Sequence, residues 1–324
     1  MNNKIIVDSE FKDWRLDKFL TDKLPKTRSQ IQKDIKAGLV LINNKQAKVH
    51  QFLRDQDEIT ILEKLAEDDA KPKTIKEKIK KIFNKKVFEP KILFKDKDYI
   101  ILEKPAGMLM HATAKGESNT LVDWLVKKFP EIKNLEDPVE LKKNLVSPYR
   151  PGIVHRLDRD VSGLVLIPRN LDSFEFFKRQ FKNKTIKKDY LALVHGHLSQ
   201  SNGTIEFEIS RSTEGKKMAA HPAGSGKGKK SLTEYDVIKE YINYSYVHAY
   251  PHTGRTNQIR VHFFALGHPI VGDKIYKSKL NSKVKCNRIF LHATKISFID
   301  QFGKQQDFES PLPTELQNII NSLK

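Results

Sequence analysis

A lysine-rich segment at residues 64–90 sets the first limit on how this chain can fold. It holds nine lysines and five acidic residues, together with Pro72 and Pro90. Such a segment has little apolar surface to bury, and its composition favours a tether over a packed element. We therefore expect three parts: a small module at 12–63, a basic flexible linker at 64–90, and a larger domain at 91–324.

The composition supports folded domains and an anionic partner. The 324 residues suggest about two domains of roughly 150 residues each. Lys and Arg number 59 against 40 Asp and Glu, which gives a net charge of +19, and 18 Phe with 9 Tyr can fill a core. Spread basic charge suits nucleic acid, because neutralising phosphates releases counterions. A purely solubilising surface is the alternative, and no basic amphipathic helix favours a membrane partner.

The sequence carries no signal of a membrane, secreted or metal-binding protein. No apolar run approaches the roughly 18 residues that a membrane helix needs, and residues 1–14 lack the apolar region of a secretory signal. The single Cys286 excludes an intrachain disulfide framework and a multi-cysteine metal site. His195 and His197 are close in sequence, but no third ligand stands nearby. We expect a cytoplasmic protein without a metal, and a monomer by default.

A helix is predicted in the middle of the small N-terminal module. Thr27 and Gln30 have the spacing of a capping box, which marks a helix that begins at the next residue after Thr27. Ile31 and Ile35 then fall on one face of the helix, and Gly38 is placed to end it. The module should therefore bury one face of this helix.

Basic residues are concentrated around this helix, and short strands are expected at 39–42 and 57–62. From Lys23 to Lys48 there are seven Lys or Arg and one acid. This pattern is compatible with a phosphate-facing surface and equally with an ordinary solvated helix face. The candidate RNA-contacting residues are Lys26, Arg28, Lys33 and Lys36.

Residues 91–324 alternate strand-like runs with turn signals. Strands are predicted at 91–103, 163–168, 190–194, 204–209, 234–240, 245–250 and 289–299, and helices at 120–129, 171–181, 256–265 and 314–323. Strands outnumber helices without regular alternation, which favours an α+β fold with a mixed or antiparallel sheet over a doubly wound one. The glycine- and lysine-rich segment 224–231 lacks phosphate-loop spacing, so we interpret it as a flexible basic loop able to touch RNA.

The stretch 150–168 is the most informative part of the larger domain. A polar loop containing Asp158 and Asp160 lies between two apolar arms. A carboxylate held between rigid flanks with arginine neighbours is a candidate nucleophile, base or metal ligand. A structural ion-pair turn is the competing interpretation.

Two further stretches supply candidate partners for that carboxylate. In 252–267, a turn leads into a predicted helix on which Arg260 can bond a buried carboxylate, while Arg255 and the helix amides would suit a phosphate. In 187–196, Tyr190 opens an apolar strand; it is either a core residue or a group that stacks on a base or moves a proton.

These motifs together resemble those of the RluA/RluD family of RNA pseudouridine synthases. His155–Gly163 is similar to the family's catalytic motif. In the same order, the segments 102–108 with His111, 188–190, 253–262, 267–273 and 291–293 resemble its other motifs, over about residues 90–312. Residues 12–63 resemble the small RNA-binding domain, named for a ribosomal protein, that often precedes this catalytic domain.

The resemblance implies a fold and a reaction. The fold would be a mixed, largely antiparallel sheet flanked by helices with a central RNA-binding cleft, plus a small α/β module. A uridine in structured RNA, large-subunit ribosomal RNA above all, would be flipped out and isomerised without metal or organic cofactor. The implied catalytic residues are Asp158, Tyr190 and Arg260, and the implied substrate-binding residues are Arg156, His155, Leu291 and Arg255.

Some positions depart from the family's pattern and keep alternatives open. Val161 stands where Thr or Ser is usual, Asn257 where His is usual, and Tyr276 is not followed by the common Gly. A non-catalytic RNA-binding or ribosome-assembly factor is one alternative, and a synthase acting on transfer RNA is another. A third is a nucleoside or glycoside hydrolase that uses Asp158 with Asp160 as an acid/base pair.

Overall fold

The computed structural model describes residues 3–24, 27–43, 45–61, 89–113, 117–135, 150–212, 215, 217–277 and 284–324. The chain divides into two compact units, Met1–Lys85 and Lys86–Lys324. The predicted linker lies outside the described residues except for its last two positions, and so does Lys26. No helix in the described ranges has the length and apolar character needed to cross a membrane.

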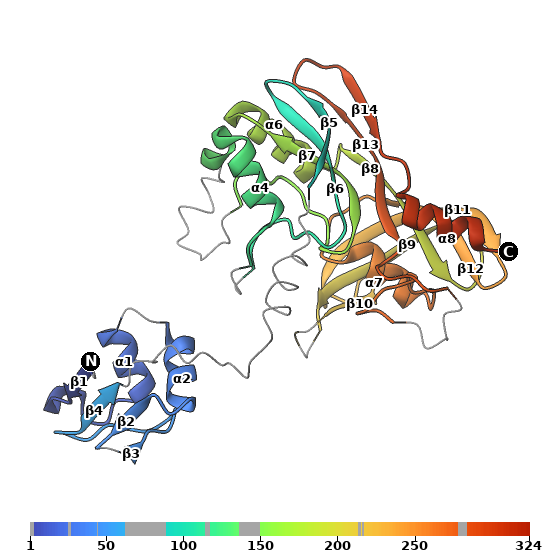
Figure 1. The fold of residues 1–324 in the computed structure, drawn as a ribbon. Coiled ribbons are helices and arrows are strands. Elements are labelled where there is room, and N and C mark those ends of the chain that lie inside the picture. Colours follow the sequence, from blue (N-terminus) through green and yellow to red (C-terminus); the bar gives the residue numbers. More distant parts are fainter. Residues whose placement is uncertain are drawn as a thin grey trace, which may run out of the picture. The chain divides into compact units, whose positions relative to one another are not determined.

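The N-terminal unit is a small sheet covered by two helices (Figure 1). Its strands β1 (Asn3–Ile6), β4 (Glu58–Ile61), β2 (Val40–Ile42) and β3 (Lys45–Gln46) are hydrogen-bonded in that order. The helices are α1 (Leu16–Lys23) and α2 (Arg28–Lys36), preceded by the 3₁₀ turn η1 (Ser9–Phe11). The sheet therefore includes residues before the predicted start at 12, and β1, β3 and α1 were not predicted.

The predicted helix of this unit is confirmed as α2. The Thr27 hydroxyl accepts a hydrogen bond from the Gln30 amide, and the Gln30 side chain accepts one from the Thr27 amide, which completes the capping box. Ile31 and Ile35 are fully buried in the unit's apolar core. Gly38 has a φ of +77°, the left-handed conformation that ends the helix.

The C-terminal unit is built on one large, mixed sheet of ten described strands (Figure 1). Along the sheet the order is β10-β9-β11-β12-β8-β13-β7-β6-β5, with β14 also paired to β13. Every pairing is antiparallel except that of β13 with β7, so the predicted largely antiparallel α+β fold is confirmed. The strands are β5 (Lys91–Lys95), β6 (Tyr99–Lys104), β7 (Ser162–Pro168), β8 (Lys187–His195), β9 (Asn202–Arg211), β10 (Met218–Pro222), β11 (Lys229–Tyr241), β12 (Tyr244–Pro251), β13 (Leu291–Ile299) and β14 (Gln305–Glu309).

Apolar side chains on both faces of the sheet explain why its middle strands are buried. In β7, Val165 and Ile167 join the larger apolar cluster, whereas Leu164 and Leu166 join a second cluster on the other face. This follows from the two-residue period of a strand. A continuous apolar run such as 163–168 is therefore the expected pattern for a strand covered on both sides.

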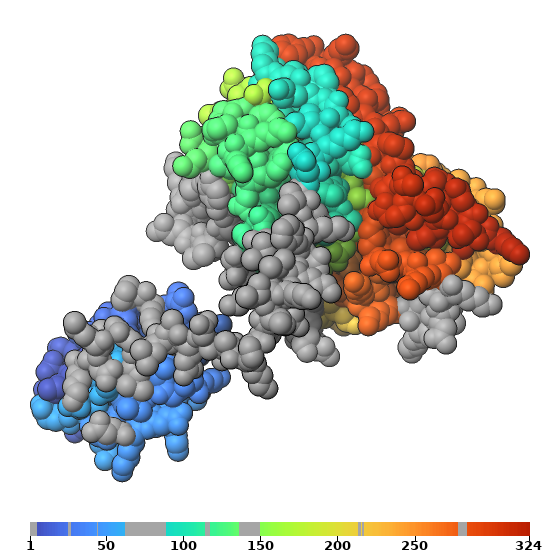
Figure 2. Space-filling model, viewed as in Figure 1, coloured from blue at the N-terminus to red at the C-terminus, as the bar shows by residue number. Residues whose placement is uncertain are grey.

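Helices complete the unit. They are α4 (Leu121–Lys128), α6 (Leu171–Asn183), α7 (Gln258–Ala265) and α8 (Thr314–Ser322), with the 3₁₀ turn η2 (Pro130–Asn134) after α4. α6 places Phe177 in the second apolar cluster, and α4 places Leu121 and Leu125 in the larger one. In the space-filling view, α8 lies at the surface in dark red (Figure 2).

The structure corrects several predicted boundaries. The predicted strand 91–103 is a hairpin of β5 and β6, because Asp96 turns the chain by accepting hydrogen bonds from the amides of Asp98 and Tyr99. The predicted helix 256–265 begins two residues later, after Asn257 adopts a left-handed conformation with a φ of +56°. The predicted strand 289–299 begins at Leu291. Strands β10 and β14 were not predicted.

Candidate active site

A cavity of about 560 Å³ in the C-terminal unit gathers the chemically distinctive side chains. Its walls come from the polar loop before β7, the end of α6, the strand β8, and the turn that leads from β12 into α7. Segments more than 100 residues apart in sequence thus face one space. Every site residue predicted in this unit lines it: Arg156, His155, Asp158, Tyr190, Arg255, Arg260 and Leu291.

An ion pair between Asp158 and Arg260 lies in this cavity. The Arg260 Nη1 donates to Asp158 Oδ2 at 2.9 Å, and the two side chains are only 11% and 18% exposed, respectively. The predicted partnership is therefore present in the geometry. Burial alone would lower the pKa of Arg260, but Asp273 and Asp158 outweigh that effect and raise it, so the guanidinium remains charged.

Asp273 anchors the same arginine from behind. Its two oxygens accept hydrogen bonds from Arg260 Nε at 2.7 Å and Nη2 at 2.9 Å, and its side chain is fully buried. The amides of Ile275 and Tyr276 also donate to it. A bidentate pair fixes the plane of the guanidinium. Asp273 was not predicted as a site residue, although its segment 267–273 was among the family-like motifs.

Asn257, one of the unusual positions, contributes to the same cluster. Its Oδ1 accepts a hydrogen bond from Arg260 Nη1 at 3.2 Å, and its Nδ2 donates to the Tyr276 hydroxyl at 3.3 Å. The Tyr276 ring lies under the Arg260 guanidinium, 5.2 Å from its carbon to the ring centroid. Asn257 therefore hydrogen-bonds the arginine directly, whereas Val161 is a buried apolar side chain.

A buried lysine supports the loop that carries Asp158. Lys104, at the end of β6, donates from Nζ to the carbonyl oxygens of Pro105, Met108 and Arg159 at 2.9–3.1 Å. The Gly107 amide also donates to the Arg159 carbonyl. Burial lowers the pKa of Lys104 to about 7, against the opposing effect of Asp158. Its role depends on contacts 55 residues apart in sequence, which explains why it was not predicted.

A second chain of hydrogen bonds holds the other end of the loop to β13. Arg288 Nη2 donates to the Ser162 hydroxyl at 2.9 Å, and that hydroxyl lies 2.9 Å from His292 Nδ1. The Ser310 carbonyl can only accept, so His292 Nε2 carries the proton and donates to it. In a neutral ring Nδ1 then accepts from the Ser162 hydroxyl. Burial lowers the pKa of His292 to about 4, in keeping with a neutral ring.

Gly163 allows this close approach of β7 and β13. It has a φ of +119°, and a Cβ at this position would lie 2.2 Å from the Ala293 carbonyl oxygen. Neither the conformation nor the space would accept another residue without a shift of the backbone. The loop that presents Asp158 is therefore fixed by backbone geometry as well as by polar contacts.

Tyr190 lies in the middle of β8, between Ala249 of β12 and Ala293 of β13 in the register of the sheet. These small neighbours leave room beside the ring, which is 9% exposed and lines the cavity. Burial, assisted by the charge of Asp158, raises the pKa of the Tyr190 phenol. The phenol therefore keeps its proton at neutral pH, and Leu291 supplies an apolar wall of the cavity.

His155 is held by the protein itself. Its Nε2 accepts a hydrogen bond from the Leu166 amide at 2.9 Å, and its ring stacks on Phe181 with 4.5 Å between centroids. Burial, with a smaller contribution from the charge of Lys188, lowers the pKa of His155 to about 3. A neutral ring with one nitrogen occupied suits the positioning of the loop, and the neighbouring Arg156 is exposed.

The turn into α7, where the sequence suggests a phosphate site, makes several hydrogen bonds within the protein. The Arg255 amide donates to the Gln258 side chain, and the Gln258 amide donates to the Arg255 carbonyl. The Arg255 guanidinium itself donates to the Lys230 carbonyl at 3.1 Å. These bonds use the Arg255 amide, its Nε and the Gln258 amide, and a phosphate site at this turn stays a prediction.

Asp160 does not share the cavity that Asp158 lines. It pairs with Arg159 at 3.0 Å, with side chains 40% and 59% exposed. Burial alone would raise the pKa of Asp160, but Arg159 lowers it on balance. A paired-carboxylate hydrolase needs both acids around one bond, and this geometry gives that alternative no support. Nor do the described ranges contain a group of three or more His, Cys, Asp or Glu able to hold a metal ion.

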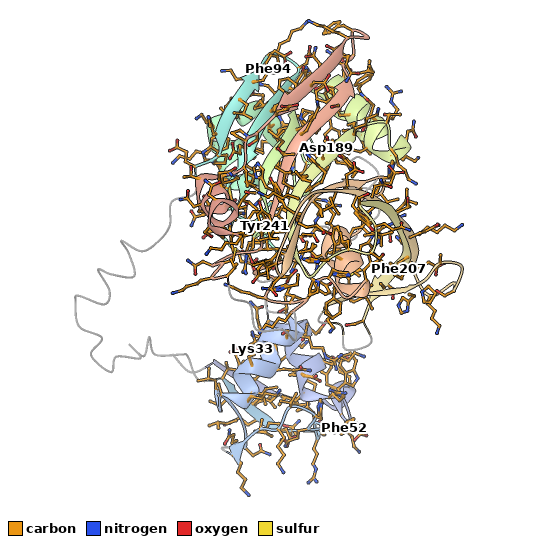
Figure 3. All side chains as sticks on the ribbon, turned by 90° about the vertical axis from the view of Figure 1, so that its right-hand side faces the viewer. Lys33, Phe52, Phe94, Asp189, Phe207 and Tyr241 are labelled. Carbon is orange, nitrogen blue, oxygen red and sulfur yellow. The ribbon has the colours of Figure 1, made fainter. Side chains whose placement is uncertain are left out.

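The N-terminal candidates form a separate surface. Lys33, labelled in Figure 3, is exposed on α2, and so is Lys36. Arg28 and Arg15 are both bound to Asp17, which is fully buried and also accepts a hydrogen bond from Gln32. Burial alone would raise the pKa of Asp17, but Arg28, Gln32 and Arg15 lower it on balance.

Comparison with known proteins now identifies the class of molecule. Residues 98–265 match the family model described as RNA pseudouridylate synthase, and residues 14–59 match the S4 domain model. The chain therefore belongs to the RNA pseudouridine synthase family, whose reaction is an isomerisation. The resemblance predicted from the sequence motifs and from residues 12–63 is confirmed.

Individual relatives agree with this assignment. An uncharacterised RNA pseudouridine synthase of Bacillus subtilis is 30% identical over 322 residues, covering 99% of this chain and 97% of that protein. The ribosomal large subunit pseudouridine synthase C of Buchnera aphidicola is 31% identical, over 98% and 96% of the two chains. Among solved structures, human RNA pseudouridylate synthase domain containing 1 is similar with a TM-score of 0.57 and 27% identity, over 72% of this chain and 88% of that one.

Proposed function

We propose that this RNA pseudouridine synthase modifies specific uridines of large-subunit ribosomal RNA in the cytoplasm, with Asp158 as the catalytic residue. The observation that carries the proposal is the buried Asp158–Arg260–Asp273 cluster in a cavity that also holds Tyr190 and Leu291. The ribosomal target is supported by the name of the Buchnera relative and by the N-terminal S4 unit. Both features are independent of the chemistry at Asp158.

The reaction requires a group that helps to break one bond between sugar and base and to form another. In uridine the sugar is joined to N1 of the base, and in pseudouridine to C5; the C5 proton leaves and N1 gains one, so no atom is lost. A carboxylate can start this sequence by attacking the sugar or by taking a proton. Arg260, held in plane by Asp273, fixes the direction of the Asp158 oxygens.

The other cavity residues have complementary tasks. The Tyr190 phenol, protonated at neutral pH, can donate a hydrogen bond to the uracil, and its ring offers a stacking face. Leu291 supplies apolar contact that keeps water from the reacting carbon. Flipping a base from its stack costs a few kcal/mol. Arg156, which is exposed on the loop, would offset part of this cost by filling the vacated position.

The test is a map of pseudouridines in total RNA from cells with and without the gene. Each deletion strain is rescued with wild type or with Asp158→Asn. We expect sites in large-subunit ribosomal RNA to disappear on deletion and to return with wild type only. Altered sites in transfer RNA would replace the proposed target. Restoration by Asp158→Asn would contradict the catalytic role, and unchanged RNA throughout would favour the non-catalytic binder.

A further inference from the structure

Lys188 lines the cavity but has no part in the proposed chemistry. It stands two residues before Tyr190 on β8, so the strand period places both side chains on the same face. Both line the cavity. The intervening Asp189, marked in Figure 3, alternates to the opposite face of the sheet. The topology therefore aims an ammonium group into the same space as the tyrosine.

This ammonium makes no hydrogen bond and no ion pair with any residue in the described part of the chain. Burial lowers the pKa of Lys188 to about 8, so most of the population is charged at neutral pH. The nearby His155 ring is neutral and occupied by the Leu166 amide. A partly buried charge without an acceptor in the protein is costly, and a ligand in the cavity that Lys188 lines can supply that acceptor.

Lysines at the end of α6 continue this wall toward the solvent. Lys182 and Lys184 are exposed and line the same cavity. Lys178 also lines it, and it pairs with Glu175 at 3.4 Å. The wall is thus basic from the partly buried Lys188 outward, which suits a ligand with more than one negative group along its length.

We propose that Lys188 binds the phosphate that flanks the flipped uridine, and that Lys182 and Lys184 bind phosphates next to it along the strand. The proposal rests on the proposed function in that the ligand is a nucleotide of RNA. A phosphate is a better partner than the uracil for chemical reasons. The base must turn over between the two bonding steps, whereas the sugar–phosphate backbone must stay in place for the bond to be remade at the same sugar carbon.

The first experiment measures phosphate recognition without turnover. Uridine, uridine 5′-monophosphate and uridine 3′-monophosphate are titrated into the full-length protein and followed by NMR. We expect at least one monophosphate to bind about tenfold more tightly than uridine, as for a hydrogen bond to a charged group. Lys188→Gln should remove this preference. Lys187→Gln, which takes one charge from the adjacent exposed position of β8, should keep it.

The second experiment uses an RNA fragment that the wild type modifies. Lys188→Gln should raise KM by about tenfold with little change in kcat, and should lower the slope of log affinity against log salt by about one. Lys188→Arg, which keeps the charge, should restore most of the affinity and separates loss of the contact from misfolding. A retained monophosphate preference in folded Lys188→Gln would overturn the proposal.

The two experiments also separate this inference from the proposed function. If the monophosphate preference depends on Lys188 but no RNA is isomerised, the phosphate site stands and the proposed ribosomal RNA activity fails. If the wild type isomerises RNA and Lys188→Gln changes neither KM nor the salt slope, the activity stands and the phosphate site fails.

Discussion

Each unit of the protein contains a fully buried aspartate bound to arginine. In one cluster the arginines are exposed to solvent, and in the other the arginine lines a cavity. In the N-terminal unit, Asp17 holds Arg15 and Arg28, whose side chains remain 35% and 52% exposed. In the C-terminal unit, Asp273 holds Arg260, which is 11% exposed and carries a second carboxylate, Asp158. The buried anchor is the same; the exposure of the arginines differs.

From this difference in arginine exposure we infer that the two clusters have different functions. Exposed guanidinium groups held in place by a buried acid are ready to meet phosphate, because part of their side-chain ordering is already done. A buried guanidinium with a second carboxylate instead fixes the direction of that carboxylate inside a cavity. We therefore expect changes around Asp17 to alter RNA affinity and changes around Asp273 to alter turnover.

The largest loss of turnover is expected when Asp158, the carboxylate in the cavity, is changed. Asp158→Asn keeps the shape of the side chain but removes its charge, so turnover should fall at least about a thousandfold. Affinity for an RNA fragment modified by the wild type should stay within about threefold, since Asp158 contributes no positive charge. Single-turnover kinetics and filter binding measure the two quantities. Equal losses in both would mean that the two clusters cannot be told apart by function.

Replacing Asp273, which anchors Arg260, should also lower turnover, but by less than replacing Asp158. Asp273→Asn loses one strong, charged bond to Arg260, and we expect kcat to fall about 10- to 100-fold with KM nearly unchanged. Asp300→Asn is the matched control: Asp300 is also buried and accepts several hydrogen bonds, but it lies in the turn between β13 and β14 and does not line the cavity. A kcat loss of similar size in the control would reduce Asp273 to a general stabilising residue.

Parts of both units could be predicted from the sequence. The α2 capping box could be predicted because its residues are three apart, and the apolar runs of β7 and β8 show buried strands directly. Asp158 and Arg260 were predicted through family-like motifs, although 102 residues separate them.

Their supports could not be predicted, because each depends on a tertiary approach. Lys104 reaches a carbonyl 55 residues away, and Arg288 reaches Ser162 from 126 residues away. Helix α1 is a different case: Leu16, Phe19 and Leu20 have the spacing of a buried helical face, so its signal was present and was missed.

A change in the solvent-exposed Asp17 cluster should alter RNA affinity and leave turnover unchanged. Asp17→Asn weakens the charged anchor of Arg15 and Arg28, and the cost of ordering these side chains then falls on RNA binding. We expect affinity to drop roughly three- to tenfold with kcat at saturating RNA unchanged. Trp14 lies in this unit and Trp124 in the other, so a Trp124→Phe background reports whether the N-terminal unit is still folded. A fall in kcat with a folded unit would contradict the separation of roles.

The smallest effect is a pH dependence that belongs to the cavity and not to the N-terminal surface. Lys188, with its pKa lowered to about 8 by burial, is charged below that pH and loses its charge above it. A monophosphate is almost fully ionised above pH 7, so its preference over uridine should fall about fourfold between pH 7 and 8.5, in proportion to the charged fraction of the lysine.

Of the groups facing Lys188, His155 is neutral and Tyr190 keeps its proton across this range, while the charged Lys182 and Lys184 lie at the outer wall. Lys188→Arg should therefore flatten the profile, because arginine stays charged in this interval. The Asp17→Asn protein, altered only in the other unit, should keep the wild-type profile. A profile that persists in Lys188→Arg would locate the titrating group elsewhere in the cavity.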